Sequence, residues 1–277
     1  ITAFEGAALL ELGPLRSVVR FRWRYLDSWV EQDMIVYGQS RRIDFMTRAD
    51  WREQRQLLKV AFPVEIRAVE ATYDIQFGNV KRPTHWNTSW DYARFESVGH
   101  QWADLSERGY GVSLLNDCKY GYDIKDNVMR LTLIKAARIP DATADLGMHE
   151  FTYSLLPHEG DWVKGSTVRE AWALNQPLTC AQGSAGKQSY SLLHVSGEHV
   201  IIDAVKKAED EDAIVVRLHE YAGSRRKVTL ATELPVASWQ ACDLLERPEG
   251  ELHSADQPIS FELKPYELKS VFIRLKA

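Results

Sequence analysis

The chain is poor in the features that mark several large classes of protein. Its 277 residues include only three cysteines, Cys118, Cys180 and Cys242, which are widely spaced and odd in number. This spacing matches neither a disulfide framework nor a zinc motif, and it is typical of a reducing compartment such as the cytoplasm. We therefore expect free thiols and a cytoplasmic protein.

Long hydrophobic runs and basic blocks are also missing. No apolar run approaches the length of a membrane span, and no signal-peptide pattern opens the chain. The net charge is -5, with 26% charged residues and no cluster of lysine and arginine. The composition predicts an ordinary soluble protein with no nucleic-acid and no membrane partner.

The eight histidines show none of the spacings that bind a metal. They form no HxH or HExxH motif and no pair four residues apart with a carboxylate partner. We therefore predict no metal site in this chain.

Alternation of apolar and polar residues is the main structural signal. Between positions 18 and 30, arginines alternate strictly with aromatic residues, which predicts a half-exposed strand with a solvated arginine face. Similar patterns predict further strands at 34–37, 42–45, 57–64, 65–73, 92–102, 128–134 and 149–156. Regular short strands separated by turns favour a sandwich.

One helix and one linker interrupt the strands. Helical spacing of apolar residues predicts a helix over 165–176, with Ser166 or Thr167 as its cap and Pro177 beyond its end. Small and polar residues at 181–187 predict a linker. Shorter strands follow, and we expect a domain at 1–187 and a second, smaller β-sandwich at 188–277.

The segment from Arg82 to Ile124 is the richest in chemistry. It crowds aromatic rings, charged groups and amides together, with Gly, Pro and Asn at the bends. Flat rings suit the faces of a pyranose and forked polar groups suit its hydroxyls, so the composition is typical of a sugar-binding surface. Positions 79–90 are predicted to be a long loop, and such a loop in a compact β domain is either functional or disordered.

Longer motifs in the sequence resemble those of a known family. They include 50–53, 57–63, 82–85, 87–91, 109–112, 115–123, 140–141, 144–145, His149, 153–155, 157–158 and 205–210. In this order they resemble the C-terminal region of family 38 glycoside hydrolases, the α-mannosidases, in their cytosolic and bacterial branch. The resemblance covers nearly the whole chain.

The resemblance implies an all-β fold, with a large galactose-mutarotase-like supersandwich followed by a smaller β-sandwich. Family members are retaining α-mannosidases whose Asp nucleophile also ligates zinc. The resemblance implies that the nucleophile and the zinc site lie on a missing N-terminal catalytic barrel, because no part of this chain matches their motifs. Residue 1 is Ile, so we expect an excised piece that is inactive alone, with zinc or another divalent metal in the missing domain.

In the family, loops of the large β domain help to wall the sugar cleft. The residues here that are candidates for this role are Arg82, His85, Trp90, Asp91, Asp117, Lys119, Tyr120, Tyr122, Asp145 and His149. Their alternative role is to pin loops and the inter-domain contact through hydrogen bonds and ion pairs. The expected partners are an α-mannoside or oligosaccharide, the N-terminal catalytic domain of the same chain, and further copies in a homo-oligomer.

Two other functions remain open at this point. Trp-rich loops on a β-sandwich are compatible with a non-catalytic carbohydrate-binding module. A mutarotase-like sugar epimerase would need a glutamate base and a histidine acid converging on one concave sheet, and no motif here places such a pair.

Overall fold

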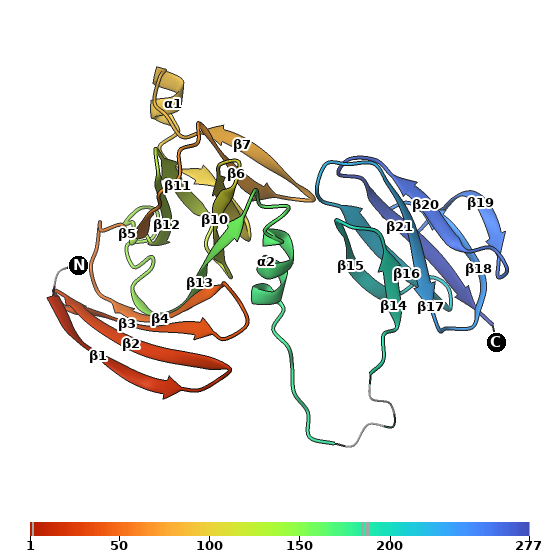
Figure 1. The fold of residues 1–277 in the computed structure, drawn as a ribbon, viewed down its shortest axis with the longest axis horizontal. Helices are drawn as coiled ribbons and strands as arrows, with labels where there is room; N and C mark the ends of the chain where they lie inside the picture. The colour runs from red at the N-terminus through yellow and green to blue at the C-terminus, as the bar shows by residue number, and fades with distance from the viewer. Residues whose placement is uncertain (2, 184–185, 187–188, 277) are drawn as a thin grey trace. The chain divides into compact units, whose positions relative to one another are not determined.

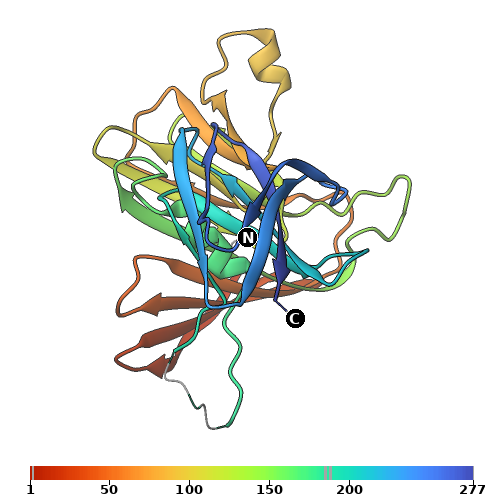
Figure 2. The ribbon, with the colours of Figure 1, turned by 90° about the vertical axis from the view of Figure 1, so that its right-hand side faces the viewer.

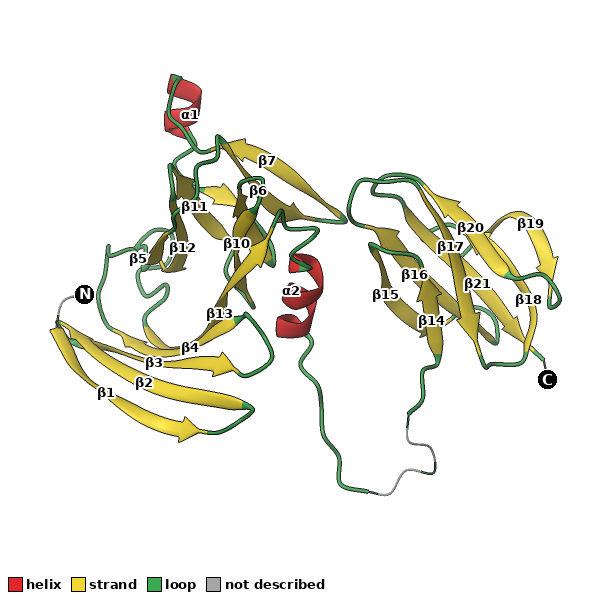
Figure 3. Cartoon of the chain, viewed as in Figure 1, coloured by secondary structure: helices red, strands yellow, loops and turns green. Residues whose placement is uncertain are grey.

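The computed structural model describes residues 1, 3–183, 186 and 189–276. In this part the regular elements are strands and two helices, as Figure 3 shows by colour. The all-β prediction is confirmed. The contacts divide the chain into two units, Ile1–Ile75 with Val80–Thr179, and Gln76–Asn79 with Cys180–Ala277. The predicted boundary between residues 187 and 188 lies outside the described residues and stays a prediction.

The first unit contains two sheets (Figure 1). The larger sheet has the order β1-β2-β3-β4-β13-β10-β9-β6-β7 and the smaller one has the order β5-β12-β11-β8. The strands of the larger sheet are β1 (Ala3–Leu12), β2 (Arg16–Tyr25), β3 (Ser28–Tyr37), β4 (Ile43–Trp51), β6 (Glu70–Ile75), β7 (Gly78–Pro83), β9 (Trp102–Ser106), β10 (Tyr110–Asn116) and β13 (Gly147–Glu159). Those of the smaller sheet are β5 (Leu58–Pro63), β8 (Ser97–Val98), β11 (Gly121–Lys125) and β12 (Val128–Ile134).

The core lies between these two sheets. Residues directly opposite each other in antiparallel strands share a face, so the register assigns the apolar positions of the larger sheet to one side. Trp51, Leu114 and Tyr153 from the larger sheet pack there with Met129 and Leu131 from the smaller sheet, and all five are buried. The alternation in β12 that predicted a strand therefore also gives its inward face.

The opposite face of β2 carries the arginines. Arg20 contacts Asp33 at 2.7 Å, Arg22 contacts Glu31 at 2.7 Å, and Arg24 contacts Glu5 at 2.8 Å. These partners lie on the neighbouring strands β3 and β1. The predicted charged strand face is confirmed, and it is a row of cross-strand ion pairs.

Helix α2 (Thr167–Asn175) confirms the helix predicted near its position and packs against β10 and β9. Ser166, one of the two predicted caps, is the N-cap, but its backbone is left-handed, with φ 55°, and its side chain makes no capping hydrogen bond. The Thr167 hydroxyl instead points inward, 2.7 Å from Ser113 Oγ, because the helix start is used to cover a polar patch of the sheet.

The loop predicted at 79–90 is shorter than expected, because β7 extends to Pro83 and helix α1 (Ser89–Ala93) begins at Ser89. Helix α1 also takes the start of the strand predicted at 92–102. The strand prediction is wrong over most of that range, since only Ser97–Val98 forms β8 before β9 begins. A capping box explains the difference. The Thr88 hydroxyl accepts from the Asp91 backbone N–H, and the Asp91 carboxylate accepts from the Thr88 N–H. In Figures 1 and 2, α1 stands clear of the strands of the first unit.

The second unit is a smaller sandwich, as predicted. Its sheets have the orders β14-β17-β20 and β15-β16-β21-β18-β19. The strands are β14 (Leu193–Ser196), β15 (Val200–Lys207), β16 (Ala213–Glu220), β17 (Arg226–Thr232), β18 (Val236–Cys242), β19 (Pro248–Ser254), β20 (Ile259–Leu263) and β21 (Leu268–Leu275). Leu218, Val228, Leu263 and Ile273 meet in its core.

No helix in the described residues is long and apolar enough to cross a membrane.

Candidate carbohydrate-facing site

The site begins with the end of β7 and the segment that follows it. The Arg82 guanidinium donates to the Val98 carbonyl at 2.8 Å and lies 4.6 Å from the centre of the Tyr73 ring. Burial lowers the pKa of Arg82 from its usual range. Arg82 therefore fastens β7 to the β8 segment. This is the loop-pinning role that was predicted as the alternative to lining the sugar cleft.

His85 and Asp91 lie close together next to Arg82. His85 Nδ1 is 3.7 Å from Asp91 Oδ2. The Thr88 hydroxyl donates to the same carboxylate at 2.9 Å, and this hydrogen bond is the main reason why the pKa of Asp91 is lowered. Asp91 thus stays ionised, and its first task is to hold the start of α1.

The cavity beneath α1 is too small for a sugar. Arg82 and Asp91 line it with Tyr73, Phe95 and Asp123, and its volume is about 10 Å³. A cavity of this size holds about one water molecule. A hexose cannot enter, so any contact with sugar here must be made by the outer surface of the segment.

That outer surface is aromatic. The exposed fractions are 75% for Trp90, 72% for Tyr92, 70% for Phe95 and 52% for Trp86. The Trp86 and Tyr92 rings meet edge to face with centres 6.4 Å apart, and Lys125 Nζ lies 5.7 Å from the Trp86 ring. We call these four side chains the α1 aromatic surface. Exposed rings of this kind suit a pyranose face or another apolar partner.

The residues at 117–122 separate into an exposed group and a buried one. The Asp117 carboxylate accepts from the Thr152 backbone N–H at 2.8 Å, and Lys119 Nζ lies 4.4 Å from the centre of the Phe151 ring. Tyr120 is 59% exposed, with its ring edge to face with His100. Tyr122 has no exposed surface, so stacking on a sugar falls to Tyr120 alone.

Tyr122 is a core residue because it occupies an inward position of β11. Its hydroxyl donates to the Leu114 carbonyl at 3.2 Å and accepts from Asn116 Nδ2 at 2.6 Å. Burial raises its pKa well above the usual range. Gly121 begins β11.

Asp145 and His149 form a pair at the start of β13. The Asp145 carboxylate accepts from the backbone N–H groups of Lys135 and Ala136, at 3.1 and 3.0 Å. His149 Nε2 lies 2.8 Å from the Asp145 carbonyl oxygen, so this nitrogen carries the proton and donates. Both residues pin the loop before β13.

The predicted residues are held at two places in the first unit. At the first place, β13 carries His149 and also contacts the 117–119 segment, through Thr152 to Asp117 and through Phe151 to Lys119. Arg82, His85, Trp90 and Asp91 lie at the second place. The β8 segment links the two, because Val98 accepts from Arg82 and the Gly99 N–H donates to the Tyr120 carbonyl at 3.1 Å.

Sequence reasoning missed a charged cluster on the outward face of the smaller sheet. Lys59 Nζ lies 3.5 Å from Glu96 and 3.7 Å from Asp123, and Arg130 lies 3.5 Å from Asp123. Thr132 donates to Glu96. One Asp123 oxygen is buried with no partner among the described residues. The polar positions of β12 were the available signal, since the residues that alternate with its core face must point outward.

A second missed cluster is buried beneath α2. His158 Nε2 and the Ser113 hydroxyl each lie 2.8 Å from Asp104 Oδ2, and Thr167 contacts Ser113. His158 is 4% exposed and Asp104 is 2% exposed. A histidine and a carboxylate therefore meet beneath α2, but the carboxylate is an aspartate and both side chains are almost fully buried, so the geometry does not favour the epimerase.

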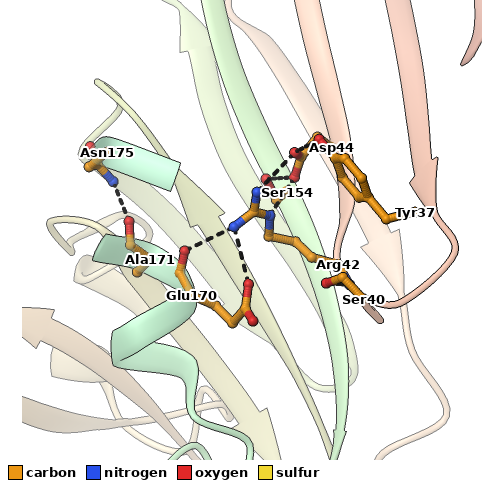
Figure 4. A network of polar contacts seen from close by, with 8 residues as sticks. All are labelled: Tyr37, Ser40, Arg42, Asp44, Ser154, Glu170, Ala171 and Asn175. Atoms are coloured by element: carbon orange, nitrogen blue, oxygen red, sulfur yellow. Dashed lines mark hydrogen bonds and ion pairs between the residues drawn. The ribbon is translucent and has the colours of Figure 1, made fainter. Parts of the chain in front are cut away.

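Figure 4 shows a third network, between β4 and α2. Arg42 donates to Asp44 Oδ1 at 2.8 Å and to Glu170 Oε2 at 3.1 Å. Tyr37 and Ser154 donate to the Asp44 carboxylate at 2.7 and 2.6 Å. Burial alone would lower the pKa of Arg42, but the two carboxylates outweigh it and the pKa is raised. This network fastens the helix to the sheet.

The side chains at these sites can donate to and accept from hydroxyl groups. The described residues contain no group of three or more His, Cys, Asp or Glu side chains placed to hold a metal ion. The Glu96 and Asp123 carboxylates share the Lys59 ammonium, so they present acceptors beside donors, which is the arrangement that binds hydroxyl groups.

The fold and these motifs define a family. Residues 5–143 match the model of the glycosyl hydrolases family 38 C-terminal domain, and residues 199–271 match the family 38 C-terminal beta sandwich domain. The chain belongs to glycosyl hydrolases family 38 and comprises its C-terminal domains.

Similar proteins bear the name α-mannosidase. The chain is 41% identical to alpha-mannosidase 2C1 of Homo sapiens over 90% of its own length, and 37% identical to an alpha-mannosidase of Saccharomyces cerevisiae over 83%. It spans 25% and 23% of those two proteins. An alpha-mannosidase structure from Enterococcus faecalis superposes with a TM-score of 0.81 at 17% identity, covering 98% of this chain and 35% of that one. That likeness concerns the fold.

Proposed function

We propose that this chain forms the C-terminal β domains of an α-mannosidase-type retaining glycosidase. Its matches to family 38 C-terminal domains along both units carry the proposal, together with relatives named α-mannosidases that are about four times as long. In this proposal the reactive carboxylates and the zinc or other divalent metal lie in the N-terminal part of the full-length protein. The partners are that part and an α-mannoside or oligosaccharide.

Within that enzyme, the α1 aromatic surface and the 117–120 segment would wall part of the sugar cleft. The exposed rings of Trp90 and Tyr120 supply stacking surfaces, and the cluster around Lys59 supplies donors and acceptors. The polar groups of four further residues hold the backbone of these loops, so these residues would position the cleft wall without contacting sugar. They are Arg82, Asp91, Asp145 and His149.

The full-length protein tests this proposal with an aryl α-mannoside. We expect mannose release that stops with a chelator and returns with a divalent metal, with retention of the anomeric configuration followed by NMR. Inversion, or turnover indifferent to metal removal, would contradict the retaining, metal-assisted mechanism.

We also propose a cytoplasmic location and a role in mannose metabolism. The free cysteines Cys118, Cys180 and Cys242 support the location. A homo-oligomer stays a prediction.

A second candidate function is glycan binding without cleavage. The observation that favours it is the set of exposed rings at Trp86, Trp90, Tyr92 and Phe95. Titration of the 277-residue chain with mannose oligosaccharides, followed by calorimetry, distinguishes the two functions. Tight binding by this chain, with no turnover by the full-length protein, would favour the binding module.

A further inference from the structure

The larger sheet of the first unit extends past the smaller sheet that covers it. Trp23 still packs against the core of this unit, but the apolar residues beyond it do not belong to that core; they are Phe4, Leu9, Val19, Phe21 and Met34. The core-side face of β1, β2 and β3 is nevertheless apolar there. We call it the overhanging face, and it consists of Phe4, Leu9, Val19, Phe21, Trp23 and Met34.

The register places these side chains on one face. Phe4 is opposite Trp23, Leu9 is opposite Val19, and Val19 is opposite Met34. Directly opposed residues in antiparallel strands point to the same side. The Phe21 and Trp23 rings stack with centres 5.7 Å apart, and the Phe4 ring lies 6.1 Å from Trp23. These side chains therefore form one apolar surface, and the polar Gln32, opposite Phe21 on β3, lies beside it with its amide donating to Thr47 and Tyr153.

The contrast with the other side of the same strands is sharp. That side carries the ion pairs of Arg20, Arg22 and Arg24, whereas the overhanging face has no charged residue. Phe4 is 56% exposed and Leu9 is 60% exposed. A sheet that separates charge from apolar area so cleanly is built to have its apolar side covered.

The edge of β1 is poorly suited to pairing with a second copy. Its register with β2 is irregular between Phe4 and Gly6 and again between Leu9 and Glu11, and Gly6 has a φ of 144°. Glu5 and Glu11 add charge along this edge. Irregular register and charge are devices that oppose edge-to-edge strand addition.

We infer that the overhanging face docks the N-terminal part of the full-length protein, through an apolar face presented by that part. This inference rests on the proposal that the chain is the C-terminal quarter of a longer glycosidase. About three quarters of the length of its relatives lies outside the matched region, and the matched models are C-terminal domains. Polypeptide joined ahead of β1 is tethered beside Phe4, which gives it a high effective concentration at this surface.

The test is hydroxyl-radical footprinting of the full-length protein and of the 277-residue chain. We expect oxidation of Phe4, Phe21, Trp23 and Met34 to be several-fold slower in the full-length protein at every protein concentration. Tyr110, exposed at the far end of β10, is the reference. Equal oxidation in the two proteins would overturn the inference. Protection that appears in either protein only as concentration rises would also overturn it and would assign the face to a second copy.

Paired variants of the full-length protein supply a second readout. Phe21→Glu places a charge in the proposed interface, and Arg22→Glu changes the next residue, which points to the ion-paired side. We expect Phe21→Glu, but not Arg22→Glu, to restore oxidation of Trp23 and Met34. Unchanged protection in Phe21→Glu would contradict the inference. Because footprinting does not depend on turnover, an inactive but protected protein would contradict the proposed function alone.

Discussion

The Arg42 guanidinium reaches Glu170, 128 positions further along the chain, at 3.1 Å. It also donates to the carbonyl of the same residue at 3.2 Å, so it holds the helix by both backbone and side chain. Since Arg42 also pairs with the buried Asp44, one side chain joins the edge of β4 to α2. Helix α2, which covers the polar face of the larger sheet, is therefore held in place by this contact.

Replacing Arg42 should be costly. Arg42→Met leaves the Asp44 carboxylate buried without its cation, and we expect a loss of about 3 kcal/mol in the free energy of unfolding. The measurement is the urea midpoint of the 277-residue chain. Arg41→Met is the matched control: its side chain is exposed and 3.6 Å from Glu159, so the loss should be below about 0.5 kcal/mol. Equal losses in the two variants would contradict the role of the network.

Cys118 should be a slow thiol despite its exposed position. Burial of the sulfur, followed by a hydrogen bond to the Asp117 carboxylate and its charge, raises the pKa of Cys118 to about 11. The thiolate is the reactive form, so at pH 8 we expect iodoacetamide to react about a hundredfold more slowly than with an unstructured 114–123 peptide. The rate should keep rising as the pH approaches 11.

Asp117→Asn tests the cause of that slow reaction. The substitution removes the charge that opposes thiolate formation while leaving the shape of residue 117 almost unchanged. Labelling of Cys118 should therefore accelerate. A Cys118 that reacts as fast as the peptide in the unmodified chain would show that Asp117 and burial do not hold the proton.

Much of the fold follows from alternation and spacing. The charged and aromatic faces of β2, the inward face of β12 and helix α2 all lie where the period of the residues predicts them. Helix α1 was missed because its apolar residues stay exposed and give no amphipathic pattern. Its signal was the Thr88–Asp91 capping box, which is a polar signal of only two side chains.

The capping box makes α1 sensitive to acid. The pKa of Asp91 is lowered in the folded chain, chiefly by the Thr88 hydrogen bond. Its stabilisation is therefore complete above the unfolded pKa and is lost as the pH falls through the lower, folded pKa. Hydrogen exchange at the Tyr92 amide, which donates to the Thr88 carbonyl, should lose protection at acid pH. In the Asp91→Asn variant the Tyr92 amide should be less protected at neutral pH, and its exchange should not respond to acid. A pH response that persists in this variant would exclude Asp91 as the titrating group.

The α1 aromatic surface should affect substrate binding in the full-length enzyme. Trp90→Ala removes a 75% exposed ring, so the stability of the fold should not change. If the ring stacks on sugar, KM for an oligosaccharide should rise about fivefold, the equivalent of about 1 kcal/mol. Tyr110 begins β10, whereas the 117–120 segment follows the end of that strand, so Tyr110→Ala should leave KM unchanged. Identical KM values for both variants and the unmodified enzyme would remove α1 from the cleft wall.

The candidate site was harder to predict than the fold, for a physical reason. Lys59, Glu96 and Asp123 lie far apart in the sequence, and only the pairing of β5, β12 and β11 brings them together. Tyr122 shows the opposite case. Its polar neighbours resemble a sugar-binding surface, but Tyr122 and Ile124 alternate into the core, and that period determines where the ring lies.

The most direct measurement compares mannose release from an aryl α-mannoside by the full-length protein and by the 277-residue chain, at equal molar concentration and with divalent metal present. We expect turnover by the full-length protein and none by this chain, because in our proposal the reactive carboxylates and the divalent metal lie in the N-terminal part. Turnover by the 277-residue chain alone would contradict the assignment of catalysis to the N-terminal part.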